Sequence, residues 1–295
     1  MLSGNLVGFA LLLLAKWAVS LSQEYQGAII DPSLILIPLA IGIVCAFFWV
    51  PLKLGSFEWV GYSLITTAIG VVGASRVLHE GTVCLVIVSP LLYFAVIAGV
   101  ALGRIWFRKD RGKLNLCLSP LFAFLVLGEV FTRSDREGIV TDEIIIHAPA
   151  AKVWPHVTTF PEIAATPRYW LFHLGLPMPM STSSAGDFVG AHRECVFSGG
   201  AIFKETVAEI DPGAKLTFDI VESPSDPELI GHLSAHRGQF ILRENGDGTT
   251  TLTGSTWYTL HVRPLWYFDW WTKEIFSAVH LRVMEHVRSL SESPA

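Results

Sequence analysis

The sequence predicts an α-helical membrane domain followed by an α+β domain, in which a curved antiparallel sheet is wrapped on a long C-terminal helix. Three observations lead to this prediction. The 295-residue chain is 51% hydrophobic and 16% charged, with a mean hydropathy of +0.48, outside the usual range of soluble globular proteins. From residue 139 onward, apolar residues alternate with polar ones in short runs bounded by turns. From Leu265 to Leu290 apolar residues recur at helical spacing. We therefore expect two domains, 1–134 and 135–295.

The charges divide at the same boundary. Residues 1–134 contain nine Lys/Arg and six Asp/Glu, whereas residues 135–295 contain twelve and twenty. The second part is acidic and its basic residues are scattered, which argues against a nucleic-acid partner. Three of the four cysteines lie in apolar runs and Cys195 is alone in the second part, so neither a disulfide framework nor a CxxC metal motif is available.

Five apolar runs in the first part predict about five membrane spans. The second and fourth contain no charge, and each has the roughly 20 apolar residues that a helix needs to cross a bilayer. The first is interrupted by Lys16 and lacks the charged start and cleavage site of a secretory signal, so we expect it to be retained. The runs are 6–21, 34–52, 57–75, 82–103 and 114–131.

The basic loop 104–113 determines the predicted orientation. It contains five basic residues and one acidic residue, so we expect it in the cytoplasm. With a fifth span after it, the C-terminal domain is extracytoplasmic, and this is the arrangement we favour. With four spans, or a re-entrant fifth segment, that domain stays cytoplasmic. Few polar residues lie inside the runs, which favours an anchor or a sensor over a transporter.

The second part predicts, in order, a strand, two short helices, about five more strands and one long helix. The first strand covers residues 139–148, and Pro149 lies at the start of the helix that follows. The turn-forming sequences SGG, DPGA and NGDG separate several later strands, and Pro264 marks the start of the last helix. The later strands are 187–197, 201–210, 215–223, 237–245 and 249–262. A long helix across a curved sheet encloses a cavity, because the two surfaces cannot meet everywhere.

Three segments carry a resemblance to a known family: "IIIHAPAAKVWPHVTTFPEI", "FKETVAEIDPGAKLTFDIVE" and the stretch from "TTTLTGSTWYTLHV" to the end of the last helix. Residues 139–291 resemble the START-like superfamily (SRPBCC), which includes Bet v 1 allergens and polyketide cyclase/dehydrase-type domains. The resemblance implies a helix-grip fold with a hydrophobic ligand cavity, but no particular ligand. The fused spans resemble those of bacterial membrane-anchored members, so we expect an integral protein of the bacterial inner membrane.

Two charged residues are candidate ligand contacts. Strand alternation places Arg193 on the same face as Phe197, and Glu205 on the same face as Phe203 and Val207. If these apolar residues face inward, Arg193 and Glu205 form a pair that makes a polar floor in an apolar pocket, because an unpaired buried charge is very costly. A solvent-facing pair on the outside of the sheet is the alternative.

The segment from Trp257 to Trp271 is dense in aromatic residues. Such residues can line a ligand cavity or lie at a membrane interface, where amphipathic rings prefer the headgroup region. Simple core packing beneath the last helix is the alternative. We take Trp257 and Trp271 as candidate ligand contacts.

Histidines supply the remaining candidates. His280, next to Val279 on the last helix, is a candidate ligand contact, with a structural histidine as the alternative. A Glu205–His280 pair would suit cyclase or dehydratase chemistry, which needs a proton donor and acceptor at one cavity. His232 and His236 have HxxxH spacing, but they lie where loop and strand are expected and have no obvious third ligand, so we predict no metal site.

The sequence therefore predicts a membrane-anchored domain that binds a hydrophobic small molecule or lipid, without a cofactor. Burial of apolar surface, at about 25 cal/mol per Å², would supply most of the affinity. A cavity held at the bilayer would shorten a lipid's path through water. Two alternatives stay open: a cyclase- or dehydratase-type enzyme acting on an apolar substrate in the same cavity, and a domain that only supports assembly of the membrane part. The sequence defines no oligomeric state.

Overall fold

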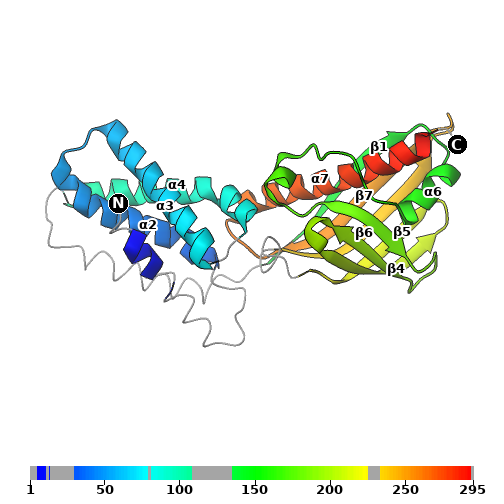
Figure 1. Cartoon of the computed structure of the whole chain (residues 1–295), viewed down its shortest axis with the longest axis horizontal. Helices are drawn as coiled ribbons and strands as arrows, with labels where there is room; N and C mark the ends of the chain where they lie inside the picture. The colour runs from blue at the N-terminus through cyan, green and yellow to red at the C-terminus, as the bar shows by residue number, and fades with distance from the viewer. Residues whose placement is uncertain are drawn as a thin grey trace. The chain divides into compact units, whose positions relative to one another are not determined.

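The chain folds as two units, residues 1–134 and 135–295. The computed structural model describes residues 5–10, 13, 30–78, 81–107, 135–224 and 233–293. In this part of the chain, the first unit is helical and the second combines a sheet with helices (Figure 1).

Among its described residues, the first unit has three long helices, α2 (Ile30–Trp49), α3 (Ser56–Leu78) and α4 (Thr82–Phe107), and the short 3-10 helix η1 (Val50–Leu52). Helices α2 and α4 approach each other at glycines. Gly42 of α2 lies against the backbone of α4, and Gly99 of α4 lies against the carbonyl of Leu39. A Cβ atom at either glycine would overlap the backbone of the other helix. Small residues at such crossings are typical of helices that pack within membranes.

Two helices in the described residues are long and apolar enough to cross a membrane, Leu34–Leu52 and Thr82–Phe107, judged by length and composition alone. They correspond to the two predicted runs that contain no charge. The prediction of about five spans is therefore not matched. The run 57–75 forms α3, but Glu58 near its start and three buried polar residues lower its hydropathy; they are Ser63, Thr66 and Thr67.

The two other predicted spans are not tested by the structure. Residues 114–131 and most of 6–21 lie outside the described part of the chain.

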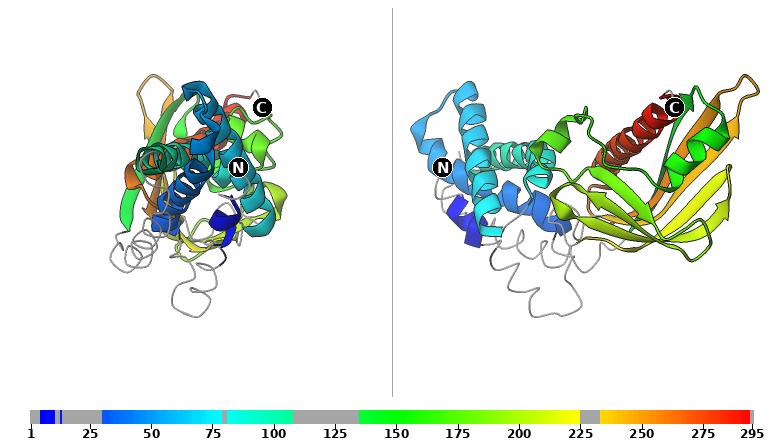
Figure 2. Two further views of the ribbon diagram at one scale, coloured as in Figure 1. Left: turned by 90° about the vertical axis from the view of Figure 1, so that its left-hand side faces the viewer. Right: turned by 45° about the vertical axis from the view of Figure 1, so that its right-hand side comes forward.

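The second unit is built on a seven-stranded antiparallel sheet in the order β1-β7-β6-β5-β4-β3-β2. The first and last strands in sequence, β1 and β7, are therefore neighbours, and β1 and β2 form the two edges of the sheet. The strands are β1 (Arg136–Ile146), β2 (Pro179–Ser184), β3 (His192–Phe197), β4 (Ile202–Asp211), β5 (Lys215–Glu222), β6 (Leu233–Glu244) and β7 (Thr250–Leu260). The sheet is curled, and α7 lies along its inner side (Figure 2).

The long helix α7 (Leu265–Glu292) begins directly after Pro264, as the sequence predicts. It contacts β1, β7, β2 and the short helix α6 (Ala150–Thr158). Two 3-10 helices complete the unit, η3 (Trp170–Leu174) and η4 (Ser198–Gly200). A curled antiparallel sheet that holds one long C-terminal helix is a helix-grip fold, which agrees with the predicted fold of this part of the chain.

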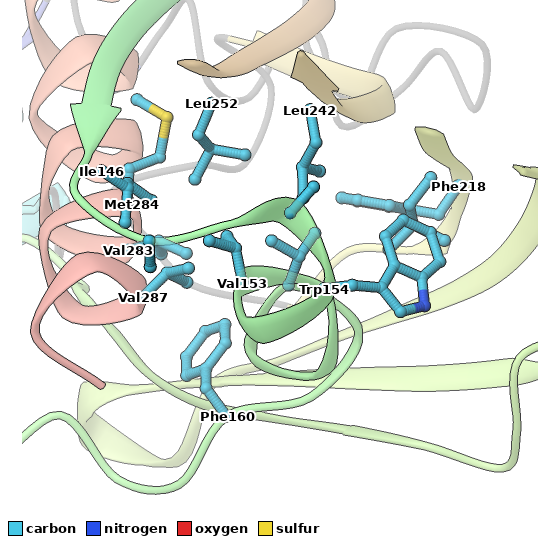
Figure 3. Packing of buried hydrophobic residues seen from close by; sticks show 14 of the residues in the cluster. Ile146, Val153, Trp154, Phe160, Phe218, Leu242, Leu252, Val283, Met284 and Val287 are labelled. Atoms are coloured by element: carbon cyan, nitrogen blue, oxygen red, sulfur yellow. The ribbon is translucent and has the colours of Figure 1, made fainter. Parts of the chain in front are cut away.

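The core of this unit is packed where α6 and the C-terminal half of α7 meet the sheet (Figure 3). Its side chains are less than a tenth exposed and come from both helices and several strands. They include Ile146, Val153, Trp154, Phe160, Phe218, Leu242, Leu252, Val283, Met284 and Val287. At this end, buried side chains of α6 and α7 pack against those of the strands.

The strand register sorts side chains onto two faces. On β7, Thr256 and Tyr258 bond residues of α7, so alternate residues from Leu252 to Tyr258 face this helix. Residues directly opposite each other share a face, so Asp142 of β1, opposite Gly254, also faces α7. Opposite residues can be followed from Thr256 of β7 through β6, β5 and β4 to β3. This places Arg193 and Glu205 on the inner face as well.

One strand was missed by the sequence prediction, which has six strands where the structure has seven. The missing strand is β2, at the edge of the sheet, with the sequence PMSTSS. It begins with a proline and has mostly small polar residues, so it lacks the apolar alternation that predicts a strand. Edge positions tolerate both features because only one side of the strand is paired.

Candidate functional site

A charged pair, Arg193 and Glu205, lies on the inner face of the sheet. The two residues are directly opposite each other on β3 and β4, and Nε of Arg193 donates a hydrogen bond to Oε2 of Glu205 at 3.2 Å. Their side chains are only 3% and 6% exposed. The guanidinium also lies 4.7 Å from the centre of the Phe218 ring, in a cation–π contact. The structure thus brings two predicted site residues together inside the domain, and they are not a solvent-facing pair.

Burial dominates the electrostatics around this pair. It raises the pKa of Glu205 to about 7, although the charge of Arg193 and its hydrogen bond act in the opposite direction. Cys195, on the same face of β3, has its pKa raised to about 12 by burial and by the charge of Glu205. The Cys195 thiol is therefore neutral near pH 7, and in this form it is a poor nucleophile.

Apolar side chains beside the pair remain partly exposed. The register places Phe197, Phe203 and Ile220 on the same inner face, and the Phe197 and Phe203 rings lie 4.8 Å apart. All three side chains have intermediate exposure, whereas Leu242 and Leu252 at the other end of the sheet are buried. The inner face is thus tightly packed at one end and partly accessible at the other.

His280 lies at a second polar cluster on the inner side, which joins α7 to two strands. Its Nδ1 is 2.8 Å from Oδ2 of Asp142 on β1, and its Nε2 is 2.8 Å from Oγ1 of Thr256 on β7. Ser277, one turn earlier on α7, donates to the other Asp142 oxygen at 2.6 Å. His280 is therefore fully hydrogen-bonded and buried. The sequence analysis did not identify Asp142, Thr256 or Ser277.

His280 and Glu205 have separate partners. Glu205 bonds Arg193 on β3, whereas His280 bonds residues of β1 and β7, and strands β5 and β6 lie between β4 and β7. The acid–base pair of Glu205 with His280 that the cyclase alternative needs is thus not a contact of this structure.

The two candidate tryptophans occupy different environments. Trp257 lies between Thr256 and Tyr258 on β7, and alternation turns it to the face away from α7, opposite Ile139. Trp271 of α7 is partly buried and makes an edge-to-face contact with Trp170 of η3, with ring centres 6.4 Å apart. The Nε1 of Trp271 is buried and has no hydrogen-bond partner in the described part of the chain. Trp257 is therefore on the outer face of the sheet, whereas Trp271 packs against η3.

The aromatic residues between Trp257 and Trp271 lie in different environments. Tyr258 is a core residue: it is 1% exposed, donates to Asp269 at 2.7 Å and stacks on Phe276. Trp266 and Trp270 are exposed on the first turns of α7. The segment is thus neither a uniform cavity lining nor a uniform core.

The described residues contain no group of three or more His, Cys, Asp or Glu placed to hold a metal ion. Of the HxxxH pair, His236 is exposed on β6 and its Nε2 is 2.7 Å from the Thr259 hydroxyl. His232 lies outside the described residues.

Fold and site together define a helix-grip domain with two buried polar clusters on its inner side. Comparisons with known proteins add solved structures of low similarity. One, a structural genomics target from Nitrosospira multiformis, is 19% identical and covers 53% of this chain and 97% of its own, with a TM-score of 0.38. Another is truncated norcoclaurine synthase from Thalictrum flavum, 14% identical over 56% of this chain and 99% of its own, with a TM-score of 0.39.

A further structure is norcoclaurine synthase from the same plant in complex with dopamine and hydroxybenzaldehyde. It is 15% identical and covers 55% of this chain and 91% of its own, with a TM-score of 0.37. No family model matches this chain, and no curated protein matches it. The assignment of the fold rests on the strand order and on α7.

Proposed function

We propose that this protein is a membrane-anchored helix-grip domain of START-like type that binds a hydrophobic small molecule or lipid on the inner face of its sheet. In this proposal, the ligand occupies the partly accessible end near Phe197 and Phe203, and its polar group contacts Arg193 and Glu205. The observation that carries the proposal is a buried ion pair among apolar side chains that are themselves not fully buried.

Energetics favour a functional role for this pair. A buried ion pair loses much of its hydration, and apolar residues of similar size often stabilise a protein equally well or better. The raised pKa of Glu205 indicates that desolvation destabilises the ionised carboxylate more than its interaction with Arg193 stabilises it. A ligand with one polar group could accept from the guanidinium or exchange a hydrogen bond with Glu205 while its apolar part covers Phe197 and Phe203. That combination is usual in pockets for small apolar ligands.

Two features of the first unit support anchoring in a membrane. Several large apolar side chains point outward from its helices, including Phe48, Phe57, Leu64, Phe94 and Ile105. A contiguous apolar surface is unfavourable in water and favourable in a bilayer. The close approach of α2 and α4 at Gly42 and Gly99 is the kind of packing that helices use in lipid, where no hydrophobic effect drives association.

Native mass spectrometry of the full-length protein, purified in detergent from membranes, tests ligand binding. We expect an apolar molecule to be retained by the protein and recovered chemically unchanged. Phe203→Glu should abolish retention, because it places a charge on the inner face. Ile202→Glu is the matched control, since Ile202 is the neighbouring residue on β4, is exposed and faces away. Reproducibly empty wild-type protein, or equal loss in both variants, would contradict the proposal.

Alkaline extraction tests the anchor, and a topology reporter tests its orientation. An integral protein stays in the membrane pellet at high pH, and we expect the full chain to do so. We also propose that the second unit is extracytoplasmic, from the basic loop 104–113 in the cytoplasm and one predicted span after it, 114–131. Alkaline phosphatase fused after residue 295 should then be active in a bacterial host. Release at high pH contradicts the anchor, and an inactive fusion contradicts the orientation only.

A further inference from the structure

The cluster around His280 forms a continuous chain of hydroxyl, imidazole and carboxylate. Thr256 Oγ1 and His280 Nε2 are 2.8 Å apart, and His280 Nδ1 and Asp142 Oδ2 are also 2.8 Å apart. The three residues come from β7, α7 and β1, which are adjacent in the fold. A nucleophile and a base within hydrogen-bond reach, with the base oriented by a third group, is the arrangement that activates hydroxyl nucleophiles in enzymes.

The hydrogen bonds determine which atoms carry protons. Burial acts to raise the pKa of Asp142, but hydrogen bonds from His280 and Ser277 outweigh it and keep the pKa below its usual value. An ionised carboxylate only accepts hydrogen bonds, so Nδ1 of His280 carries the proton. In the neutral imidazole, Nε2 is then the acceptor, and the Thr256 hydroxyl donates to it. The contacts thus match the neutral tautomer that a general base needs, with the proton on Nδ1 and Nε2 free to accept.

Burial distinguishes this chain of groups from a solvated hydrogen-bond network. The side chains of His280 and Asp142 are 7% and 18% exposed, and Thr256 is partly exposed on the inner face. Next to Thr256 on this face is Gly238 of β6, which has no side chain and is covered by the Phe218 ring. The His280–Asp142 pair is thus largely shielded from water, and in such a setting a base and its carboxylate interact more strongly than in water.

We propose that Thr256 is a nucleophile, activated by His280 and positioned by Asp142, which cleaves esters of apolar carboxylic acids bound on the inner face of the sheet. This inference rests on the proposed function, because the apolar acyl chain must enter the same interior. It adds an activity, acyl transfer to water, which ligand binding alone does not include.

The reaction balances with water as the only co-reactant. Oγ1 of Thr256 attacks the ester carbonyl carbon while its proton passes to Nε2 of His280. The tetrahedral intermediate then expels the alcohol, which takes this proton, and an acyl ester remains on Thr256. Water, deprotonated by His280, attacks the acyl carbonyl, releases the carboxylic acid and restores the Thr256 hydroxyl. Asp142 holds the Nδ1 proton throughout and stabilises the imidazolium as it forms.

The same domain contains a second set of these groups, which serves as an internal control. Ser234 Oγ is 2.9 Å from Nε2 of His261, and Nδ1 of His261 is 3.1 Å from Oδ1 of Asp135. The Asp135 side chain is 66% exposed, and the register places Ser234, opposite Thr259, on the face away from α7. Water competes for these hydrogen bonds, and an apolar acyl chain has no enclosed surface there. We expect no contribution from this set.

Hydrolysis of p-nitrophenyl octanoate by the full-length protein in detergent tests the proposal. Thr256→Val, which keeps the shape and removes the hydroxyl, should reduce kcat by about 100-fold or more, and so should His280→Gln. Thr256→Ser should retain activity. Asp142→Asn should lower kcat and leave KM unchanged, because it acts on the His280 tautomer and not on substrate binding. Ser234→Ala and His261→Gln should match wild type. Circular dichroism and melting temperature identify any variant that has failed to fold.

Peptide mass spectrometry after brief exposure to the ester provides the second readout. We expect the octanoyl group on Thr256 in the wild-type protein, and more of it in Asp142→Asn if deacylation becomes slower than acylation. Folded wild-type protein that neither hydrolyses the ester nor becomes acylated overturns the proposal, as does acylation of another residue. If such protein still retains an apolar molecule in native mass spectrometry, ligand binding stands while the esterase proposal fails.

Discussion

Arg193 and Glu205 face each other across β3 and β4, joined by a 3.2 Å hydrogen bond and buried on the inner side of the sheet. A charged pair at this depth is not required to hold two antiparallel strands together, because the backbone ladder already does so. Its geometry specifies a polar point beside the apolar side chains of Phe197, Phe203 and Ile220 on the inner face. We therefore treat its effects on stability and on ligand binding as separable.

Replacing both charged residues by apolar ones should stabilise the domain and abolish ligand retention. Arg193→Met combined with Glu205→Leu removes two desolvated charges, and such replacements are often neutral or stabilising by about 1–4 kcal/mol. Glu205→Leu alone should destabilise by about 3–5 kcal/mol, because it leaves the guanidinium buried without its carboxylate. Chemical unfolding of the full-length protein, with native mass spectrometry of the bound ligand, measures both effects. A destabilised double variant would show that the pair is mainly structural.

The stability of the domain should depend on pH through Glu205. Its pKa is 4.5 in the unfolded chain and is raised to about 7 by burial, so the folded state binds more protons between these values. The contribution of Glu205 is therefore fully present below pH 4.5 and is lost as the pH rises to about 7. Glu205→Gln does not titrate, and the melting temperature of wild type minus that of this variant should fall between pH 5 and pH 8. A difference that increases with pH would mean that the ionised pair stabilises the fold.

Strand alternation explains why Arg193 and Glu205 could be predicted from the sequence. Arg193 shares a face of β3 with Phe197, and Glu205 shares a face of β4 with Phe203. The single assumption that these two phenylalanines point inward therefore placed both charged residues inside the domain. The same rule, applied along β7, separates Trp257 from Tyr258. The aromatic density alone could not show this, because it does not distinguish the two faces of a strand.

Asp142 could not be predicted as the partner of His280, because the contact depends on how α7 lies against β1. The residues are 138 positions apart in sequence. Asp142 alternates with Ile144 and Ile146 on the inner face of β1, and a carboxylate at such a position indicates a buried partner. That signal was available in the sequence. The identity of the partner was not, because helix periodicity predicts an apolar stripe but not its alignment with a particular strand.

Gly238→Ala should destabilise the domain and weaken ligand retention together. A Cβ atom at this position would overlap the ring of Phe218, which lies over Gly238 and also contacts the Arg193 guanidinium. Overpacking of this kind typically costs about 1–3 kcal/mol, and here it also displaces a neighbour of the polar pair. Combining Gly238→Ala with Phe218→Leu should recover part of the stability, since the smaller side chain leaves room for the methyl group. Chemical unfolding of the three variants tests this, and equal destabilisation in the single and double variants would contradict it.

Gly99→Leu should separate α2 from α4 without affecting the second unit. Gly99 lies against the backbone at Leu39, where a flexible side chain could move aside but a carbonyl group cannot. The larger residue therefore forces the helices apart, and in a bilayer the loss of close packing is not compensated by any hydrophobic effect. Gly61→Leu on α3 is the matched control, since a Cβ atom there meets nothing within 4 Å.

We expect Gly99→Leu to lower the melting temperature of the protein in detergent and Gly61→Leu to leave it near the wild-type value. Ester hydrolysis and ligand retention should persist in both variants at temperatures below melting. A loss of either activity in folded Gly99→Leu protein would mean that the packing of the helical unit affects the function of the second unit.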